Sequence, residues 1–338
     1  MINLARKKNP KIEIFDQSIE SIINLYSKIE IIADSITLPE GPVWDEDSQS
    51  LLFVDIINNK VLKWNQTTGT TDFISPGGNT GYAPNLGEGL LGPNGMAIDS
   101  EGNLIVCQHG DRRIAMVGNT ESMNPNFETV VDNYNGKRLN SPNDLTIAKD
   151  GSIYFTDPAF SFFDLNTYSF VDSDLRELDF NGVYKLDIKT DELNLISNEI
   201  EVPNGLGLSP DESVLYVNKM GPPFSKSKAK IVKIDLKTLK SETFFEGRDL
   251  FEKYNDGTDF DGMVVHSSGN IFIVDSGTHC IRKVQPDGKV ITEAGLPTVI
   301  GNDNGQGYNS KFASPNNLIM VDKKLYISGR ADNVFISG

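Results

Sequence analysis

The sequence predicts an all-β protein, a six-bladed β-propeller with four-stranded antiparallel blades around a central channel. The first observation is a short hairpin pattern, an apolar strand, a polar turn and a second apolar strand, that recurs six times in 338 residues. The second is the spacing, because consecutive copies begin 49 to 61 residues apart. That spacing is typical of propeller blades and is too long for a leucine-rich solenoid.

The third observation is that every copy begins with a side chain that carries an oxygen. These leading residues are Glu40, Asn94, Asn143, Asn204, Asp261 and Asn316. The last copy leaves room for about three strands before Gly338. We therefore expect the strand around 28–34 to complete that blade and close the ring, which protects the strand edges.

We expect two parts in the chain, an N-terminal extension with a short helix at 1–27 and the propeller domain at 28–338. Helix-like spacing of Ile14, Ile19 and Ile22 predicts the helix. An insertion at 159–181 is rich in aromatic residues. Long loops of this kind often form lids or pocket walls, although packing on the neighbouring blade is the plainer interpretation.

Composition excludes several function classes. The net charge of −16 disfavours nucleic acid as a partner, since phosphates require Lys and Arg. No apolar run approaches the roughly 18 residues of a membrane-spanning helix, so we expect no membrane partner. No signal-peptide pattern follows Met1, which predicts a cytoplasmic location. An acidic chain suits a cation, although a solvated acidic surface is a simpler explanation.

The leading residues should meet at one end of the channel, because the innermost strand of each blade lines it. Glu40, Asn143, Asn204 and Asp261 would then supply two carboxylates and two amide oxygens. Such an all-oxygen set suits one divalent cation, Ca²⁺ first, with Mg²⁺, Mn²⁺ or Zn²⁺ as alternatives. One such Asn alone is usually a turn residue, but six oxygen-bearing residues at one register favour a site.

The second strand of each hairpin returns to the same end, which predicts a second polar ring there. Its members would be Asp55, His109, Asp157, Asn218, Asp275 and Ser328. We expect His109 and Asp157 to face the pocket, although Asp157 precedes Pro158 and is also a good turn residue. Together with Asn94 and Asn316, these two residues are the candidate substrate contacts.

Several motifs resemble one known family. They are Leu38-Pro-Glu-Gly-Pro-Val-Trp44, Gly92-Pro-Asn-Gly-Met-Ala-Ile98, Arg138-Leu-Asn-Ser-Pro-Asn-Asp144, Tyr154-Phe-Thr-Asp-Pro158 and Pro203-Asn-Gly-Leu-Gly-Leu208. The chain resembles the gluconolactonase/regucalcin (senescence marker protein) family, and bacterial gluconolactonases most. That resemblance implies the same four metal ligands. One departure is Ser141, which stands where the family has a substrate-contacting Arg; whether Arg138 takes over that role is open.

The resemblance and the oxygen set together predict a metal-dependent lactonase that opens a sugar-derived aldonolactone. The cation would stabilise the charge that develops on the carbonyl oxygen, and Asp261 would act as general base toward the attacking water. One alternative is an organophosphate or phosphotriester hydrolase on the same site, with Asp261 as nucleophile. Another is a non-catalytic propeller that binds a protein partner or calcium. The oligomeric state stays open.

Overall fold

The structure is a computed structural model that describes residues 29–118, 123–225, 227–247, 258–301, 310–322, 324–329 and 332–337. The helix expected within 1–27 lies outside the described residues. No helix in the described part of the chain has the length and apolar character needed to cross a membrane. The cytoplasmic location stays a prediction.

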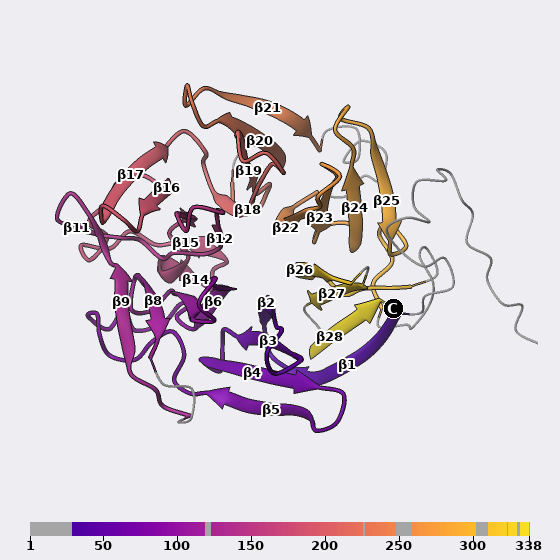
Figure 1. Cartoon of the computed structure of the whole chain (residues 1–338), viewed down its shortest axis with the longest axis horizontal. Coiled ribbons are helices and arrows are strands. Elements are labelled where there is room, and N and C mark those ends of the chain that lie inside the picture. The colour runs from indigo at the N-terminus through magenta and orange to yellow at the C-terminus, as the bar shows by residue number, and fades with distance from the viewer. Residues whose placement is uncertain are drawn as a thin grey trace, which may run out of the picture.

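Four-stranded antiparallel sheets are the building unit, and the described residues form six of them. Figure 1 shows these sheets arranged around a central axis as the blades of a propeller. The first three blades comprise β2 (Pro39–Asp45), β3 (Ser50–Asp55), β4 (Lys60–Asn65) and β5 (Gly69–Ile74); β6 (Pro93–Ile98), β7 (Leu104–Gln108), β8 (Arg113–Val117) and β9 (Phe127–Val131); and β12 (Leu145–Ile147), β13 (Ile153–Asp157), β16 (Gly182–Asp187) and β17 (Glu192–Ser197).

The fourth and fifth blades have the same strand order. They comprise β18 (Pro203–Leu208), β19 (Val214–Lys219), β20 (Lys230–Asp235) and β21 (Ser241–Glu246), then β22 (Phe260–Val265), β23 (Ile271–Asp275), β24 (Cys280–Val284) and β25 (Val290–Ala294). Smaller elements lie in the connections: β10 (Asn133–Tyr134), β11 (Lys137–Arg138), the 3₁₀ helix η2 (Phe160–Phe162), β14 (Phe163–Asp164) and β15 (Ser169–Phe170).

The last blade joins the two ends of the described chain. It comprises β26 (Pro315–Val321), β27 (Lys324–Gly329), β28 (Asp332–Ser337) and β1 (Ile29–Ile36), with β1 outermost and antiparallel to β28. The innermost strands contact one another in the cyclic order β2, β6, β12, β18, β22 and β26, and β26 returns to β2. The predicted propeller with four-stranded blades is confirmed, and so is its completion by an N-terminal strand.

Hydrophobic clusters between neighbouring blades hold the ring together. Leu51 and Phe53 of the first blade pack with Tyr326 of the last, and Tyr154 of the third blade packs with Val217 of the fourth. Strands such as β3 are buried along their whole length because both faces meet another blade. Each fully buried Leu or Phe stabilises the fold by roughly 1.5–3 kcal/mol, so the ring is a rigid frame for the channel.

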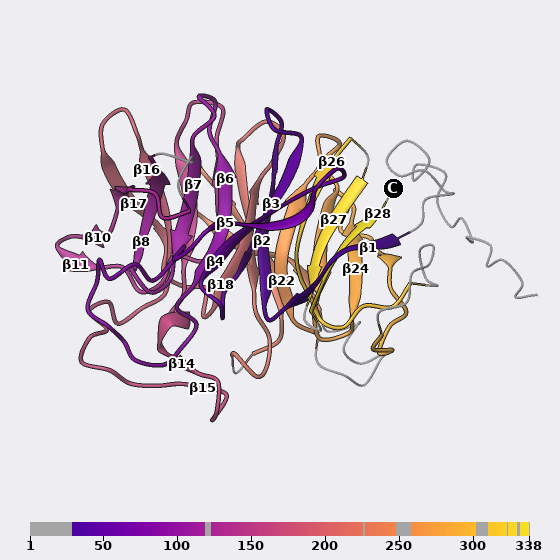
Figure 2. The same cartoon turned by 90° about the horizontal axis from the view of Figure 1, so that it is seen from below.

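The two ends of the channel carry different connections. Tight turns such as 46–49 and 99–103 join the first and second strands of each blade at one end. The longer connections, including 75–92 and 159–181, lie at the other end, where the innermost strands begin. Figure 2 shows β14 and β15 projecting below the ring at that second end, which we call the mouth.

Candidate active site

The same local irregularity stands beside nearly every leading residue. The pairing of the first two strands shifts register just after Glu40, Pro93, Pro203, Phe260 and Pro315. A β-bulge of this kind bends the strand and redirects a side chain. Repetition around the ring therefore turns the six leading side chains toward the channel axis.

A small cavity of about 40 Å³ lies at the mouth, and we call it the mouth cavity. All six leading residues line it: Glu40, Asn94, Asn143, Asn204, Asp261 and Asn316. His109 lines it as well. The structure thus brings together seven of the eight residues that the sequence singled out, from all six blades.

Three of the four amide groups in the mouth cavity have their nitrogen atoms engaged with protein atoms. Asn204 Nδ2 donates to the sulfur of Met220 (3.2 Å), and Asn316 Nδ2 donates to the Pro39 carbonyl (3.2 Å). Asn94 Nδ2 lies 3.3 Å from His109 Nε2. The carbonyl oxygens are left for the cavity, and Asn316 Oδ1 is buried without a hydrogen-bond partner among the described residues. A buried orphan acceptor of this kind is costly unless a ligand satisfies it.

Two carboxylates are buried in the same small space. Burial, and next the charge of Asp261, hold the pKa of Glu40 well above its usual range. The N–H of Gly41 donates to Glu40 Oε2 (3.1 Å) and opposes that shift. Gly41 also has a positive φ, and a Cβ there would collide with the backbone of Asn94. Glycine at this position therefore lets neighbouring innermost strands approach closely enough to gather the side chains.

His109 is held as a neutral imidazole. Burial lowers its pKa to about 4. Its Nδ1 lies 3.1 Å from the Leu90 carbonyl, to which Nδ1–H donates, so Nε2 is the acceptor for the Asn94 amide. The ring also stacks on Phe160, with centroids 6.3 Å apart. His109 thus fixes the orientation of Asn94 in the mouth cavity.

Asp157 does not line the mouth cavity, and the predicted second polar ring does not form. Asp157 accepts the N–H groups of Asn140 (2.8 Å) and Ser141 (2.7 Å) in the loop that leads into its own blade. Burial raises its pKa to about 7. Asp55 binds the N–H groups of Thr37 and Leu38 in the same way. These aspartates hold the loops that position the leading residues.

Register explains this error. In five blades, one residue of the second strand pairs with the residue just before the leading residue. These paired residues occupy structurally equivalent positions: Asp55, Gln108, Lys219, Asp275 and Gly329. The predicted second ring was displaced by one residue along the strand in three blades, because it contained His109, Asn218 and Ser328. A one-residue shift in a strand reverses the side-chain direction. The residue after the equivalent position faces the cavity, and there the chain has Ile56, His109 and Met220.

The remaining wall of the mouth cavity is apolar, which sequence reasoning missed. Its members are Leu38, Ile56, Leu90, Phe160, Met220 and Phe224. Phe224, from the loop after β19, packs on rings of the 159–181 insertion: Phe160, Phe163 and Tyr168. With Phe170, which packs on Phe160 and Phe163, these residues form what we call the aromatic cap. The aromatic content of 159–181 was the available signal for it.

Arg138, the possible replacement for the family's substrate-contacting Arg, and Ser141, which stands at the position of that Arg, both lie elsewhere. Arg138 extends toward Asp132 and Tyr82 on the outer side of its blade. Ser141 donates its hydroxyl to the Pro158 carbonyl (2.6 Å). Among the described residues, the lining of the mouth cavity includes neither of them and no Lys or Arg.

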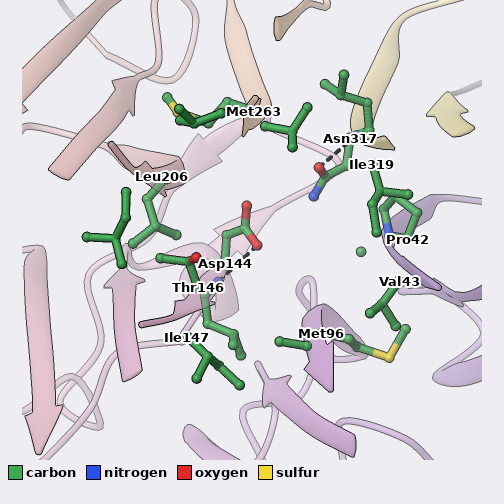
Figure 3. Close-up of a pocket in the computed structure, with 18 of the residues that line it drawn as sticks. Pro42, Val43, Met96, Asp144, Thr146, Ile147, Leu206, Met263, Asn317 and Ile319 are labelled. Carbon is green, nitrogen blue, oxygen red and sulfur yellow. Dashed lines mark hydrogen bonds between the residues drawn. The ribbon is translucent and has the colours of Figure 1, made fainter. Parts of the chain in front are cut away.

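A wider chamber of about 640 Å³ occupies the other end of the channel, and we call it the far chamber. Figure 3 shows its walls, which are formed largely by apolar side chains such as Val43, Met96 and Leu206. Asp144 and Asn317 also line it. Each directly follows the leading residue of its blade, a position at which the other four blades have glycine. Burial raises the pKa of Asp144 to about 7, while the Asn317 amide lowers the pKa of both Asp144 and Glu40.

The donor chemistry of the mouth cavity fits a hard divalent cation. The described residues contain no cluster of three or more His, Cys, Asp or Glu side chains placed to hold a metal. The mouth cavity instead combines two carboxylates with amide oxygens, which Ca²⁺ accepts readily. A cation there would offset the repulsion between Glu40 and Asp261 and give Asn316 Oδ1 a partner. We therefore judge that the residues present fit such a group.

Fold and site together define a β-propeller with an oxygen-lined pocket at one end of its channel. Comparison with known proteins gives the family: residues 38–302 match the SMP-30/Gluconolactonase/LRE-like region. The chain belongs to this family. A gluconolactonase from Zymomonas mobilis subsp. mobilis is 34% identical over 284 residues, which cover 83% of this chain and 76% of the relative.

Solved structures share the fold. A gluconolactonase from Xanthomonas campestris superposes with a TM-score of 0.72 at 23% identity, covering 98% of this chain and 96% of its own. A calcium-binding regucalcin from Agrobacterium tumefaciens gives a TM-score of 0.64 at 14% identity, covering 91% and 92%. The family resemblance predicted from the motifs is confirmed.

Proposed function

We propose that this protein hydrolyses a lactone with the help of one divalent cation bound in the mouth cavity. The observation that carries this proposal is the ring of oxygen-bearing side chains, in which two carboxylates are buried together and Asn316 Oδ1 has no hydrogen-bond partner in the part of the chain that the structure describes. Membership of the family and the 34% identical gluconolactonase support lactone ring opening as the reaction.

The cation best suited to the donor set is Ca²⁺, with Mg²⁺, Mn²⁺ or Zn²⁺ as alternatives. Glu40, Asn143, Asn204 and Asp261 would hold it, and Asn316 Oδ1 is a further candidate ligand. When bound, the cation would polarise the lactone carbonyl and stabilise the negative charge on its oxygen.

The chain's own groups have distinct tasks in this proposal. Asp261 accepts the proton of the attacking water as general base while the water oxygen bonds to the carbonyl carbon; the ring C–O bond then breaks, and Asp261 returns the proton to the departing ring oxygen. Asn218 Nδ2 donates to the backbone carbonyl of Asp261 (2.7 Å), so Asn218 acts as a positioning residue. Asn94, oriented by His109, contacts the bound substrate. Asp157 has no substrate role here, because it holds the 140–141 loop.

A pH-stat assay on δ-valerolactone tests the proposal. Protein stripped with a chelator should open the ring no faster than buffer, and added Ca²⁺ should restore an enzymatic rate. Asp211 is exposed at the opposite end of the channel. Asp211→Asn is therefore a matched control for Asp261→Asn and should retain the full rate. An enzymatic rate that is insensitive to both chelator and added cation would contradict the metal-dependent mechanism.

A further inference from the structure

The apolar wall of the mouth cavity bears on which lactone the site accepts. Beyond the oxygen ring, the lining consists of Leu38, Ile56, Leu90, Phe160, Met220 and Phe224. The cavity of about 40 Å³ is far smaller than the roughly 300–1,000 Å³ of typical ligand pockets. A substrate must therefore displace part of this wall, and the displaced apolar side chains will then contact it.

Phe224 is the part of the wall best placed to move. It is half-buried, whereas Phe160 and Phe163 are fully buried. It belongs to a different blade from the insertion on which it rests, and its contacts there are ring contacts, with centroids 5.4–5.9 Å apart. Outward rotation of Phe224 would open the cavity between two aromatic surfaces.

Beyond the oxygen ring, the described residues at the mouth offer few polar partners to a polyhydroxylated substrate. Both nitrogens of His109 are engaged, one with Leu90 and one with Asn94. Ser141 and Ser161 donate their hydroxyls to the backbone carbonyls of Pro158 and His109. Each substrate hydroxyl that is buried without a partner weakens binding on the order of tenfold.

Apolar side chains are exposed on the 159–181 insertion, among polar ones such as Asn166, Thr167 and Ser169. Leu165, Tyr168 and Val171 of the insertion are exposed, and so is Ile57 beside the cavity. Tyr168 packs on Phe163 and Phe224, so this exposed side chain adjoins the aromatic cap. A ligand bound with its carbonyl at the ring would extend its remaining atoms along this surface.

We propose that the preferred substrate is a lactone with an alkyl or aryl substituent, whose apolar arm lies against the aromatic cap, rather than a polyhydroxylated aldonolactone. This inference rests on the proposed lactonase function and replaces the sugar-derived substrate expected from the sequence. The carbonyl end meets the oxygen ring, and the arm takes the place that Phe224 leaves.

Three lactones with the same six-membered ring test this inference in the Ca²⁺-loaded protein. They are glucono-1,5-lactone, unsubstituted δ-valerolactone and δ-decalactone, which carries a pentyl arm. We expect kcat/KM for δ-decalactone to exceed that for glucono-1,5-lactone by on the order of tenfold to 100-fold, the range that apolar pocket contacts supply. Faster opening of glucono-1,5-lactone would overturn the inference and leave the lactonase proposal intact.

A cap variant separates contact with the arm from general damage. Phe224→Ser should lower kcat/KM for δ-decalactone by about tenfold and change that for δ-valerolactone less than about threefold. Phe244→Ser is the matched control: Phe244 is also half-buried and packs on an aromatic ring, Tyr216, but it lies on the outermost strand β21. It should change neither value.

Equal losses for both substrates in Phe224→Ser would overturn the assignment of the arm to the cap. Absence of enzymatic opening of all three lactones with any of the four cations would overturn the lactonase proposal and this inference together. The heat-capacity change of ligand binding provides a second readout. Binding of 5-hydroxydecanoate should show a negative heat-capacity change that shrinks in Phe224→Ser, and an unchanged value would count against the cap.

Discussion

The two ends of the channel differ in size, in chemistry and in the connections around them. The mouth cavity is small, is ringed by six oxygen-bearing side chains and lies under the aromatic cap. The far chamber is many times larger, is walled mostly by apolar side chains and is surrounded by tight turns. The same six innermost strands line both, so the difference arises within single strands.

The difference shows how a repeated fold confines chemistry to one end. In five of the six blades a bulge beside the leading residue turns a polar side chain to the axis, and the regular strand that follows carries the apolar residues needed between blades. The 159–181 insertion and the loop that carries Phe224 lie at the mouth end, where they add the cap. Changes at the mouth should therefore alter activity, and changes in the far chamber should alter stability.

The largest expected effect is at the mouth, in Asp261→Asn. This variant keeps a ligand oxygen but removes the base, so kcat should fall by about 10²–10⁴ even at saturating cation. Asn204→Asp keeps an oxygen and adds charge, so its loss should be smaller. Steady-state kinetics over a Ca²⁺ series give the answer, and full rescue of Asp261→Asn by excess Ca²⁺ would make Asp261 a ligand only.

The second effect concerns acid stability at the mouth. Because burial lowers the pKa of His109 to about 4, the folded state binds fewer protons than the unfolded state below pH 6.5. The contribution of neutral His109 to the free energy of unfolding is complete above pH 6.5. It is lost as the pH falls toward 4, and the loss reaches up to about 3 kcal/mol. Urea unfolding across this range should show a shallower acid loss in His109→Gln. An unchanged pH slope would contradict the neutral, buried imidazole.

A smaller effect is expected for the oxygen that lacks a partner. Asn316→Ala should weaken Ca²⁺ binding by roughly tenfold, because it removes one candidate ligand of several. Isothermal titration of the metal-free variant measures this directly. Asn103 provides the control, because its amide binds Asp99 in the 99–103 turn at the other end of the channel, and Asn103→Ala should leave the Ca²⁺ affinity unchanged. Equal affinities in Asn316→Ala and the parent would remove Asn316 from the ligand set.

The smallest effect belongs to the far chamber. Leu208 lines it and is half-buried, four residues beyond Asn204 on β18. Leu208→Ala should lower the free energy of unfolding by about 1 kcal/mol, below the 2–5 kcal/mol of a fully buried Leu. Its kcat should stay within about threefold of the parent. A loss of activity without a loss of stability would show that the far chamber takes part in the reaction.

The sequence predicted the part of the site that repeats. Six hairpins at one register located the leading residues, since equivalent positions in a ring must meet at one end. It misplaced Asp157, because Asp157 was treated as equivalent to His109, although the equivalent residue in the blade of His109 is Gln108. Side chains alternate between the two faces of a strand. His109 therefore faces the cavity, whereas the aspartates that were aligned with it hold loops.

The non-repeating parts were harder to predict. Phe224 reaches the mouth from another blade, and its position depends on ring contacts with 159–181 that no local pattern specifies. Asp144 was visible as the one acidic residue where most copies have glycine, but its raised pKa comes from burial in the channel. Burial is set by tertiary packing, which a single sequence does not reveal.

One titration tests directly whether a single cation in the mouth cavity supports lactone opening. Metal-free protein is titrated with Ca²⁺ in a calorimeter, and the rate of δ-valerolactone opening is measured at each step. We expect one tight site per chain and a rate that rises in proportion to its occupancy, with both signals weakened in Glu40→Gln. A rate that stays constant while the site fills, or a site that Glu40→Gln leaves unchanged, would contradict this expectation.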